Sequence, residues 1–185
     1  MKLKIGLVFL VITGVLSSCG SSSKMADATA QSKALDELVS QKSFQIESDW
    51  AQPLVTNSLI SIANAGLFPP GSSANLISLI GNTNYLKVQG DSIDMYLPYY
   101  GERQMGGGYN NDGGAIQFKG IPEDYEVSRD DKTQGQEIRF KMKNKTETFR
   151  VAVTLFPNLN STIVVNSSQR FSIRYQGQVE AILNE

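Results

Sequence analysis

Histidine is absent from all 185 residues of the chain. Its absence excludes Ser-His-Asp and Cys-His catalysis, histidine-ligated zinc and a histidine pH switch. An enzyme built from this sequence would have to rely on carboxylates, hydroxyls, lysines or tyrosines. We therefore expect a protein that is not an enzyme, with no cofactor and no metal site.

Cysteine occurs once, as Cys19, so an internal disulfide or a thiolate metal site is also excluded. A short basic segment and an apolar run over residues 5–16 precede it. The run is too short to span a bilayer and is typical of a signal peptide. Small residues ending in Ser18 resemble the cleavage site of bacterial lipoproteins, the lipobox. We predict cleavage after Ser18 and a lipid anchor on Cys19 that attaches the protein to a membrane.

Clustered positive charge is missing as well. The chain has 17 Lys and Arg residues against 18 Asp and Glu residues, a formal net charge of −1, so nucleic-acid binding is not expected. Residues 20–31 are rich in Ser and Ala and predict a flexible tether. The expected organisation is a signal peptide (1–18), a lipid-anchored tether (19–31) and one globular domain (32–185).

One helix and a series of strands account for the rest of the pattern. Residues 24–42 show helical periodicity, with an apolar face that includes Leu35 and Val39. From Ser43 onward apolar residues alternate with polar ones, as in Phe44, Ile46, Ser48 and Trp50. Similar alternation covers residues 85–89, 93–97, 138–143, 148–155 and 171–175. We predict a mainly β (α+β) fold: one N-terminal helix packed on an antiparallel, meander-type sheet of about eight strands, curled or barrel-like.

Two regions interrupt the alternation. Residues 53–81 are mostly apolar or small; their first part is compatible with a short helix, and residues 76–80 with a buried strand. This segment either exposes an apolar patch to a partner or a lipid, or covers one end of the sheet. Residues 98–114 contain too much glycine for regular structure and form the second interruption.

Several segments together resemble the Bacteroidetes domain-of-unknown-function family 4251. They are Gly90-Asp91-Ser92-Ile93, Leu97-Pro98-Tyr99-Tyr100-Gly101, Gly113-Gly114-Ala115-Ile116, Ile121-Pro122-Glu123-Asp124-Tyr125, Ile138-Arg139-Phe140 and Ser167-Ser168-Gln169-Arg170, followed by Ile173-Arg174-Tyr175-Gln176-Gly177. The resemblance runs from about Lys42 to Gly177 and implies a secreted or lipid-anchored protein of Gram-negative gut-type bacteria. It implies no activity. Residues 53–81 are longer than the usual family segment, so a role for them would be peculiar to this chain.

Aromatic residues supply the candidate binding loop. Tyr99, Tyr100 and Tyr109, with Tyr96 and Trp50, predict an aromatic platform for a sugar or a peptide, unless they pack in the core. Ser92 lies in an Asp-Ser-Ile sequence that fits the O-glycosylation pattern of Bacteroidetes, which makes it a candidate modification site.

Carboxylates offer two further interpretations. Asn110, Asn111 and Asp112 near Glu123 and Asp124 have oxygen ligands suited to calcium, but their spacing is not that of an EF-hand, so a solvated turn is favoured. Glycoside hydrolysis would need two of the acids Asp94, Asp112, Glu123 and Asp124 to flank one bond.

The function that we expect is a non-enzymatic binding or envelope-organising role for an outer-membrane lipoprotein whose partner is a protein, a glycan or a small ligand. No acid precedes Asp27 in the tether, which favours the periplasmic face. One alternative is a lipocalin-like carrier with a cavity lined by Phe140, Val151 and Phe171. The other is a carboxylate-based hydrolase.

Overall fold

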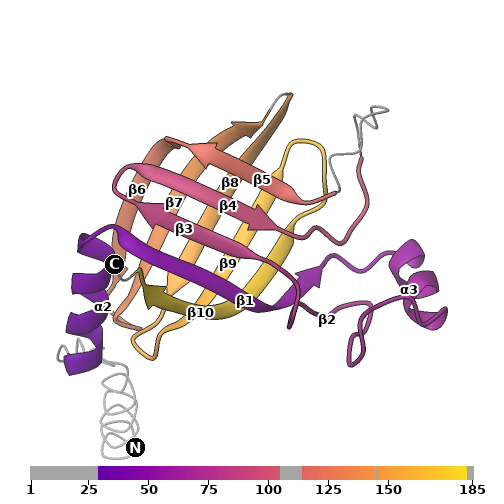
Figure 1. Ribbon diagram of the computed structural model, residues 1–185, viewed down its shortest axis with the longest axis horizontal. Helices are drawn as coiled ribbons and strands as arrows, with labels where there is room; N and C mark the ends of the chain where they lie inside the picture. The colour runs from indigo at the N-terminus through magenta and orange to yellow at the C-terminus, as the bar shows by residue number, and fades with distance from the viewer. Residues whose placement is uncertain (1–28, 105–113, 145, 183–185) are drawn as a thin grey trace, which may run out of the picture.

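The computed structural model describes residues 29–104, 114–144 and 146–182, which form two helices and ten strands (Figure 1). The elements are α2 (Ala30–Ser40), β1 (Ser43–Pro53), α3 (Asn57–Asn64), β2 (Ile77–Ser78), β3 (Tyr85–Gln89), β4 (Ser92–Leu97), β5 (Ile116–Gly120), β6 (Glu123–Asp130), β7 (Gly135–Asn144), β8 (Glu147–Leu155), β9 (Asn160–Ser167) and β10 (Ile173–Ala181). The predicted mainly β fold, with an N-terminal helix and a curled antiparallel sheet, is confirmed.

β1 joins two meanders into one sheet. The strand order is β5-β4-β3-β1-β10-β9-β8-β7-β6, and β2 pairs with β1 outside this path. Strands β3 to β5 and β6 to β10 pair as successive antiparallel neighbours, and the connections are short turns, as predicted, except for residues 98–115 between β4 and β5. β1 lies between β3 and β10, so the first and the last strands of the described chain are neighbours.

The sheet curls until its two edges approach each other (Figure 1). β5 and β6 are the edge strands, although only residues 121–122 separate them in the chain. β7 extends past β6 at its far end, where the Asn144 side-chain amide donates a hydrogen bond of 2.9 Å to the Gln117 carbonyl of β5. The result is a curled half-barrel that holds its apolar side chains inside.

α2 covers one end of this half-barrel (Figure 1). The helix begins after Thr29, whose hydroxyl accepts a hydrogen bond of 3.1 Å from the Ser32 amide as an N-cap. Leu35 and Val39 point into the core, as their helical spacing predicted. The predicted segment 24–28 lies outside the described residues.

A β-bulge in β1 changes the direction of Trp50. The sequence predicts Trp50 on the same face as Phe44, Ile46 and Ser48, but the register with β10 shifts between Ser48 and Trp50. Beyond the bulge Ala51 is buried instead, and Trp50 lies half-buried on the outer face. The expectation for Trp50 was therefore wrong, because an extra residue in a strand reverses the faces of all the residues that follow it.

Gly177 of β10 makes room for this bulge. A Cβ atom at position 177 would lie 1.9 Å from the Glu47 carbonyl oxygen and 2.5 Å from the Ser48 Cα. No side chain fits there without moving the β1 backbone. The bulge in β1 therefore depends on the glycine that lies opposite it in β10.

Residues 53–81 contain both predicted elements. α3 is the expected short helix, and β2 with Leu79 forms the buried strand segment, while Ile80 is exposed. Phe171 differs from expectation: it precedes β10 and is only half-buried. Its backbone instead contacts the loop that follows β4, where the Phe171 amide donates to the Glu102 carbonyl.

Candidate functional site

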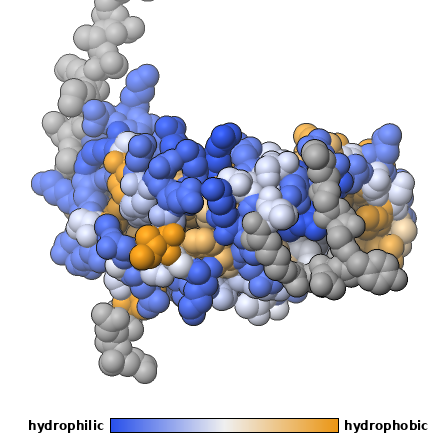
Figure 2. Space-filling model, turned by 90° about the horizontal axis from the view of Figure 1, so that it is seen from above, coloured by the Kyte–Doolittle hydropathy of each residue, from blue (hydrophilic) through white to orange (hydrophobic). Residues whose placement is uncertain are grey.

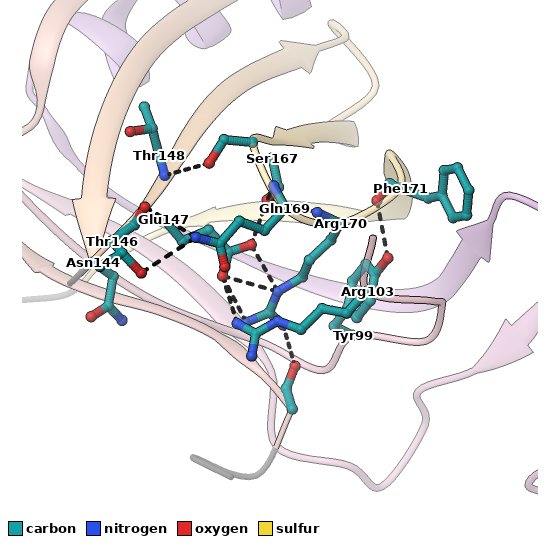
Figure 3. A network of polar contacts seen from close by, with 12 residues as sticks. Tyr99, Arg103, Asn144, Thr146, Glu147, Thr148, Ser167, Gln169, Arg170 and Phe171 are labelled. Atoms are coloured by element: carbon teal, nitrogen blue, oxygen red, sulfur yellow. Dashed lines mark hydrogen bonds and ion pairs between the residues drawn. The ribbon is translucent and has the colours of Figure 1, made fainter. Parts of the chain in front are cut away.

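A buried carboxylate holds together the region where β8 begins and β9 ends (Figure 3). The Glu147 side chain is 5% exposed and accepts hydrogen bonds from three residues. Arg170 donates from Nε to Oε1 at 2.9 Å and from Nη2 to Oε2 at 3.1 Å. Arg103 Nη2 donates to Oε2 at 2.8 Å, and the Ser167 hydroxyl donates to Oε1. We call these four residues the Glu147 network.

The carboxylate of Glu147 is favoured in its charged form in the folded protein. Burial alone would raise the pKa of Glu147, but the hydrogen bonds from Ser167, Arg170 and Arg103 outweigh it and hold the pKa below its usual value. Arg170 also donates from Nη1 to the Gly114 carbonyl at 2.6 Å. The network therefore holds residues on both sides of the segment 105–113, which lies outside the described residues.

Tyr99 and Tyr100 pack within this region. The Tyr99 hydroxyl lies 3.2 Å from the Phe171 carbonyl, and the Arg170 guanidinium lies 5.1 Å from the centre of the Tyr99 ring. Tyr100 meets Phe68 edge to face, with ring centres 6.3 Å apart. The structure thus gives both tyrosines packing contacts around the loop after β4. Tyr109, the third tyrosine of the predicted platform, lies outside the described residues.

Trp50 lies elsewhere, in a groove on the outer face of β1, β10 and β9. The groove has a volume of about 550 Å³. We call it the Trp50 groove. Two aromatic residues and mostly neutral polar ones line it: Asp49, Trp50, Phe156, Asn158, Asn160, Ser161, Thr162, Gln176, Gly177 and Gln178. The sequence indicated Trp50 as a binding residue, but the four amide residues of the groove gave no signal because they lie more than 100 residues away from Trp50 along the chain.

Tyr96 lines a second hollow, of about 430 Å³, between β4, β5 and the end of β7. It stacks on Tyr85 with ring centres 6.3 Å apart. The Tyr85 hydroxyl donates to Asp94 at 3.2 Å, and Asp94 also pairs with Lys119 at 3.0 Å. Asp94 therefore already has two partners on this face of the sheet.

The other candidate carboxylates occupy an edge strand. Glu123 and Asp124 begin β6, where Asp124 pairs with Lys141 at 2.5 Å and Glu123 lies 3.9 Å from Lys143. Both side chains are largely exposed. Asp112 and the asparagines of the calcium interpretation lie outside the described residues. Among the residues that are described, no group of three or more Asp, Glu or Cys side chains is placed to hold a metal ion.

The remaining predicted residues have ordinary positions. Ser92 begins β4, is half-buried, and its hydroxyl donates to the Gly120 carbonyl at 3.3 Å. Phe140 and Val151 are buried in the core and border a hollow of about 300 Å³ whose other lining residues include Arg139 and Lys141. Phe171 is not part of that lining.

Exposed apolar side chains gather in the segment between β1 and β3. Six large ones, which we call the apolar end, are exposed there: Leu54, Val55, Ile60, Ile62, Leu67 and Ile80. Leu67 and Ile80 are 73% and 72% exposed. α3 lies at the opposite end of the molecule from α2 (Figure 1), and Figure 2 shows apolar surface at the end that carries α3. None of the helices in the described part of the chain is long and apolar enough to cross a membrane.

A curled antiparallel half-barrel with a helix over one end defines a mainly β protein. The family model described as "Domain of unknown function (DUF4251)" matches residues 26–179, and the chain belongs to this family. The resemblance found in the sequence is thereby confirmed. No curated protein matches the chain.

A solved structure has the same fold. It is a crystal structure of a DUF4251 family protein from Bacteroides eggerthii DSM 20697, with a TM-score of 0.54 and 14% sequence identity. The match covers 85% of this chain and 92% of that chain. At this identity the likeness establishes the fold alone.

Proposed function

We propose that this protein is an outer-membrane lipoprotein that faces the periplasm and binds a partner without chemical turnover. The lipobox-like sequence before Cys19 supports the anchor. The apolar end is the observation that carries the binding role. Single exposed apolar residues are ordinary on protein surfaces, whereas six in one segment mark a contact surface.

The position of the apolar end fits this role. α2 follows the tether directly, and α3 lies at the far end of the molecule (Figure 1). A domain attached through its α2 end would direct the apolar end away from the attachment point. We therefore propose that the partner is a protein of the envelope with a complementary apolar surface.

The segment is also held firmly enough to serve as a contact surface. Thr56 caps α3 by accepting a hydrogen bond of 3.3 Å from the Leu59 amide, and Leu59 is buried. Hydrogen bonds from the Ser58 and Thr56 side chains lower the pKa of Glu102, in the loop after β4. The exposed residues thus project from a supported structure.

Site-specific photo-crosslinking in the native host tests the proposal. A photoreactive amino acid at position 67 or 80 is expected to give the same covalent adduct with one envelope protein. Position 121 is the matched control, because Ile121 is 77% exposed but lies between β5 and β6. Adducts of equal yield from all three positions, or adducts with lipid alone, would contradict a specific protein partner.

A further inference from the structure

We infer that the Trp50 groove is a carbohydrate-binding site that accepts a neutral mono- or disaccharide unit of a glycan. This inference is independent of the apolar end, because it concerns the outer face of β1, β10 and β9. Three features support it: the bulge in β1, the register of β1, β10 and β9, and the side chains that line the groove.

The bulge places the indole beside polar partners. Trp50 of β1 pairs with Gln176 of β10, and Gln176 pairs with Thr162 of β9. The three side chains therefore form one row across three strands. Gln178 and Asn160 pair in the neighbouring row. Without the bulge Trp50 would face the core, so the structure departs from regular pairing to bring the indole to this row.

The lining chemistry matches a sugar ring. An apolar aromatic face packs against the C–H groups of a pyranose, while hydroxyl groups require partners that both donate and accept hydrogen bonds. Side-chain amides do both, and the groove has four of them: Asn158, Asn160, Gln176 and Gln178. Within the described part of the chain, the side chains of Asn160, Thr162 and Gln178 make no hydrogen bond, so they are available to a ligand.

Charge and backbone pairing favour a glycan over other ligands. Asp49 is the one charged residue among those that line the groove, so nothing there attracts a phosphate or a polyanion. A peptide that binds by strand addition needs a free strand edge. β1, β10 and β9 are each paired on both sides, so these strands present no such edge. The volume of about 550 Å³ lies within the usual range of small-ligand sites.

The chain itself carries the probe, because Trp50 is its only tryptophan. The full-length protein, purified in detergent, is titrated with neutral hexoses, N-acetylhexosamines and their disaccharides while tryptophan fluorescence is recorded. We expect a saturable change in intensity or wavelength in the millimolar range or below for at least one sugar. Calorimetry with the same sugar supplies an affinity that does not depend on the fluorophore.

Two asparagines on β9 form a matched pair of variants. Asn160→Ala removes an amide of the groove, and the affinity is expected to fall about tenfold, as for the loss of one good hydrogen bond. Asn166→Ala removes an exposed amide from the other end of the same strand and should leave the affinity unchanged. Trp50→Phe keeps an aromatic ring, so it should fold and should bind more weakly by calorimetry.

Three results would overturn the inference. The first is a flat fluorescence titration with every sugar of the panel. The second is sugar binding that Asn160→Ala and Asn166→Ala weaken equally. The third is a fluorescence response to short peptides in the absence of any response to sugars.

Discussion

At the scale of single residues, we expect Glu147 to make the largest electrostatic contribution to the stability of the folded chain. Because its pKa is lower in the folded chain than in the unfolded chain, its contribution to stability is complete above the ordinary pKa of about 4.3. That contribution is lost as the pH falls through the lower folded pKa.

Glu147→Gln should therefore lower the free energy of unfolding at neutral pH by about 3–5 kcal/mol, because Arg170, with a side chain that is 9% exposed, would lose its counter-charge. Urea unfolding of the wild type and the variant at pH 7 measures the loss of unfolding free energy, and the same experiment at pH 3.5 measures how this loss depends on pH. The difference between wild type and variant should shrink at the acidic pH. A difference that stays constant would show that Glu147 is not the titrating group.

Gly177 gives a second prediction at this scale. Gly177→Ala should destabilise the domain by about 1–3 kcal/mol, because the added methyl group displaces the β1 backbone at the bulge. The fluorescence of Trp50 should change as well, since the bulge sets its position. Ser161→Ala, on the paired residue of β9, is the control and should be neutral or slightly stabilising, because the buried Ser161 hydroxyl has no hydrogen-bond partner among the described residues.

At the scale of elements, α2 packs on the half-barrel through the buried side chains of Leu35 and Val39. Leu35 is fully buried, so Leu35→Ala should cost about 2–5 kcal/mol of unfolding free energy. Leu38 only packs against the edge of the core, and Leu38→Ala should cost clearly less. Chemical denaturation of the two variants side by side checks the order, and equal losses would mean that α2 is not docked as described.

Strand prediction from sequence succeeded for several strands that have one buried face. β4, β7 and β8 show regular alternation, and their burial follows it. β6 gave no such signal, because it is an edge strand with nearly all its side chains exposed. The bulge in β1 could not be predicted, since it depends on a glycine more than 120 residues away in the chain. The Glu147 network was missed for the same reason: its members come from separate segments, and only the Ser167 to Arg170 motif pointed toward it.

At the scale of the whole molecule, we expect membrane attachment and folding to be separable. We predict that Cys19→Ser abolishes incorporation of radiolabelled palmitate and shifts the protein from the membrane fraction to the soluble fraction, while its unfolding curve stays unchanged. The first core residue that the structure describes is Leu35, so the predicted anchor on Cys19 is expected to add nothing to the packing of this core. Palmitate incorporation that persists in the variant would disprove the lipid anchor.

The pairing of β1 with β10 also governs how the chain reaches its native state. Phe44 pairs with Ala181, so a strand near the start of the domain stays without one neighbour until the last strand has been delivered. Contacts between such distant residues form slowly, because a long loop must close before they contribute. The hairpins of β3 to β5 join residues that are closer in the chain and can form earlier, whereas completion of the sheet has to wait until β10 is available to pair with β1. A truncation before Ile173 should therefore leave an aggregation-prone intermediate rather than a smaller folded domain.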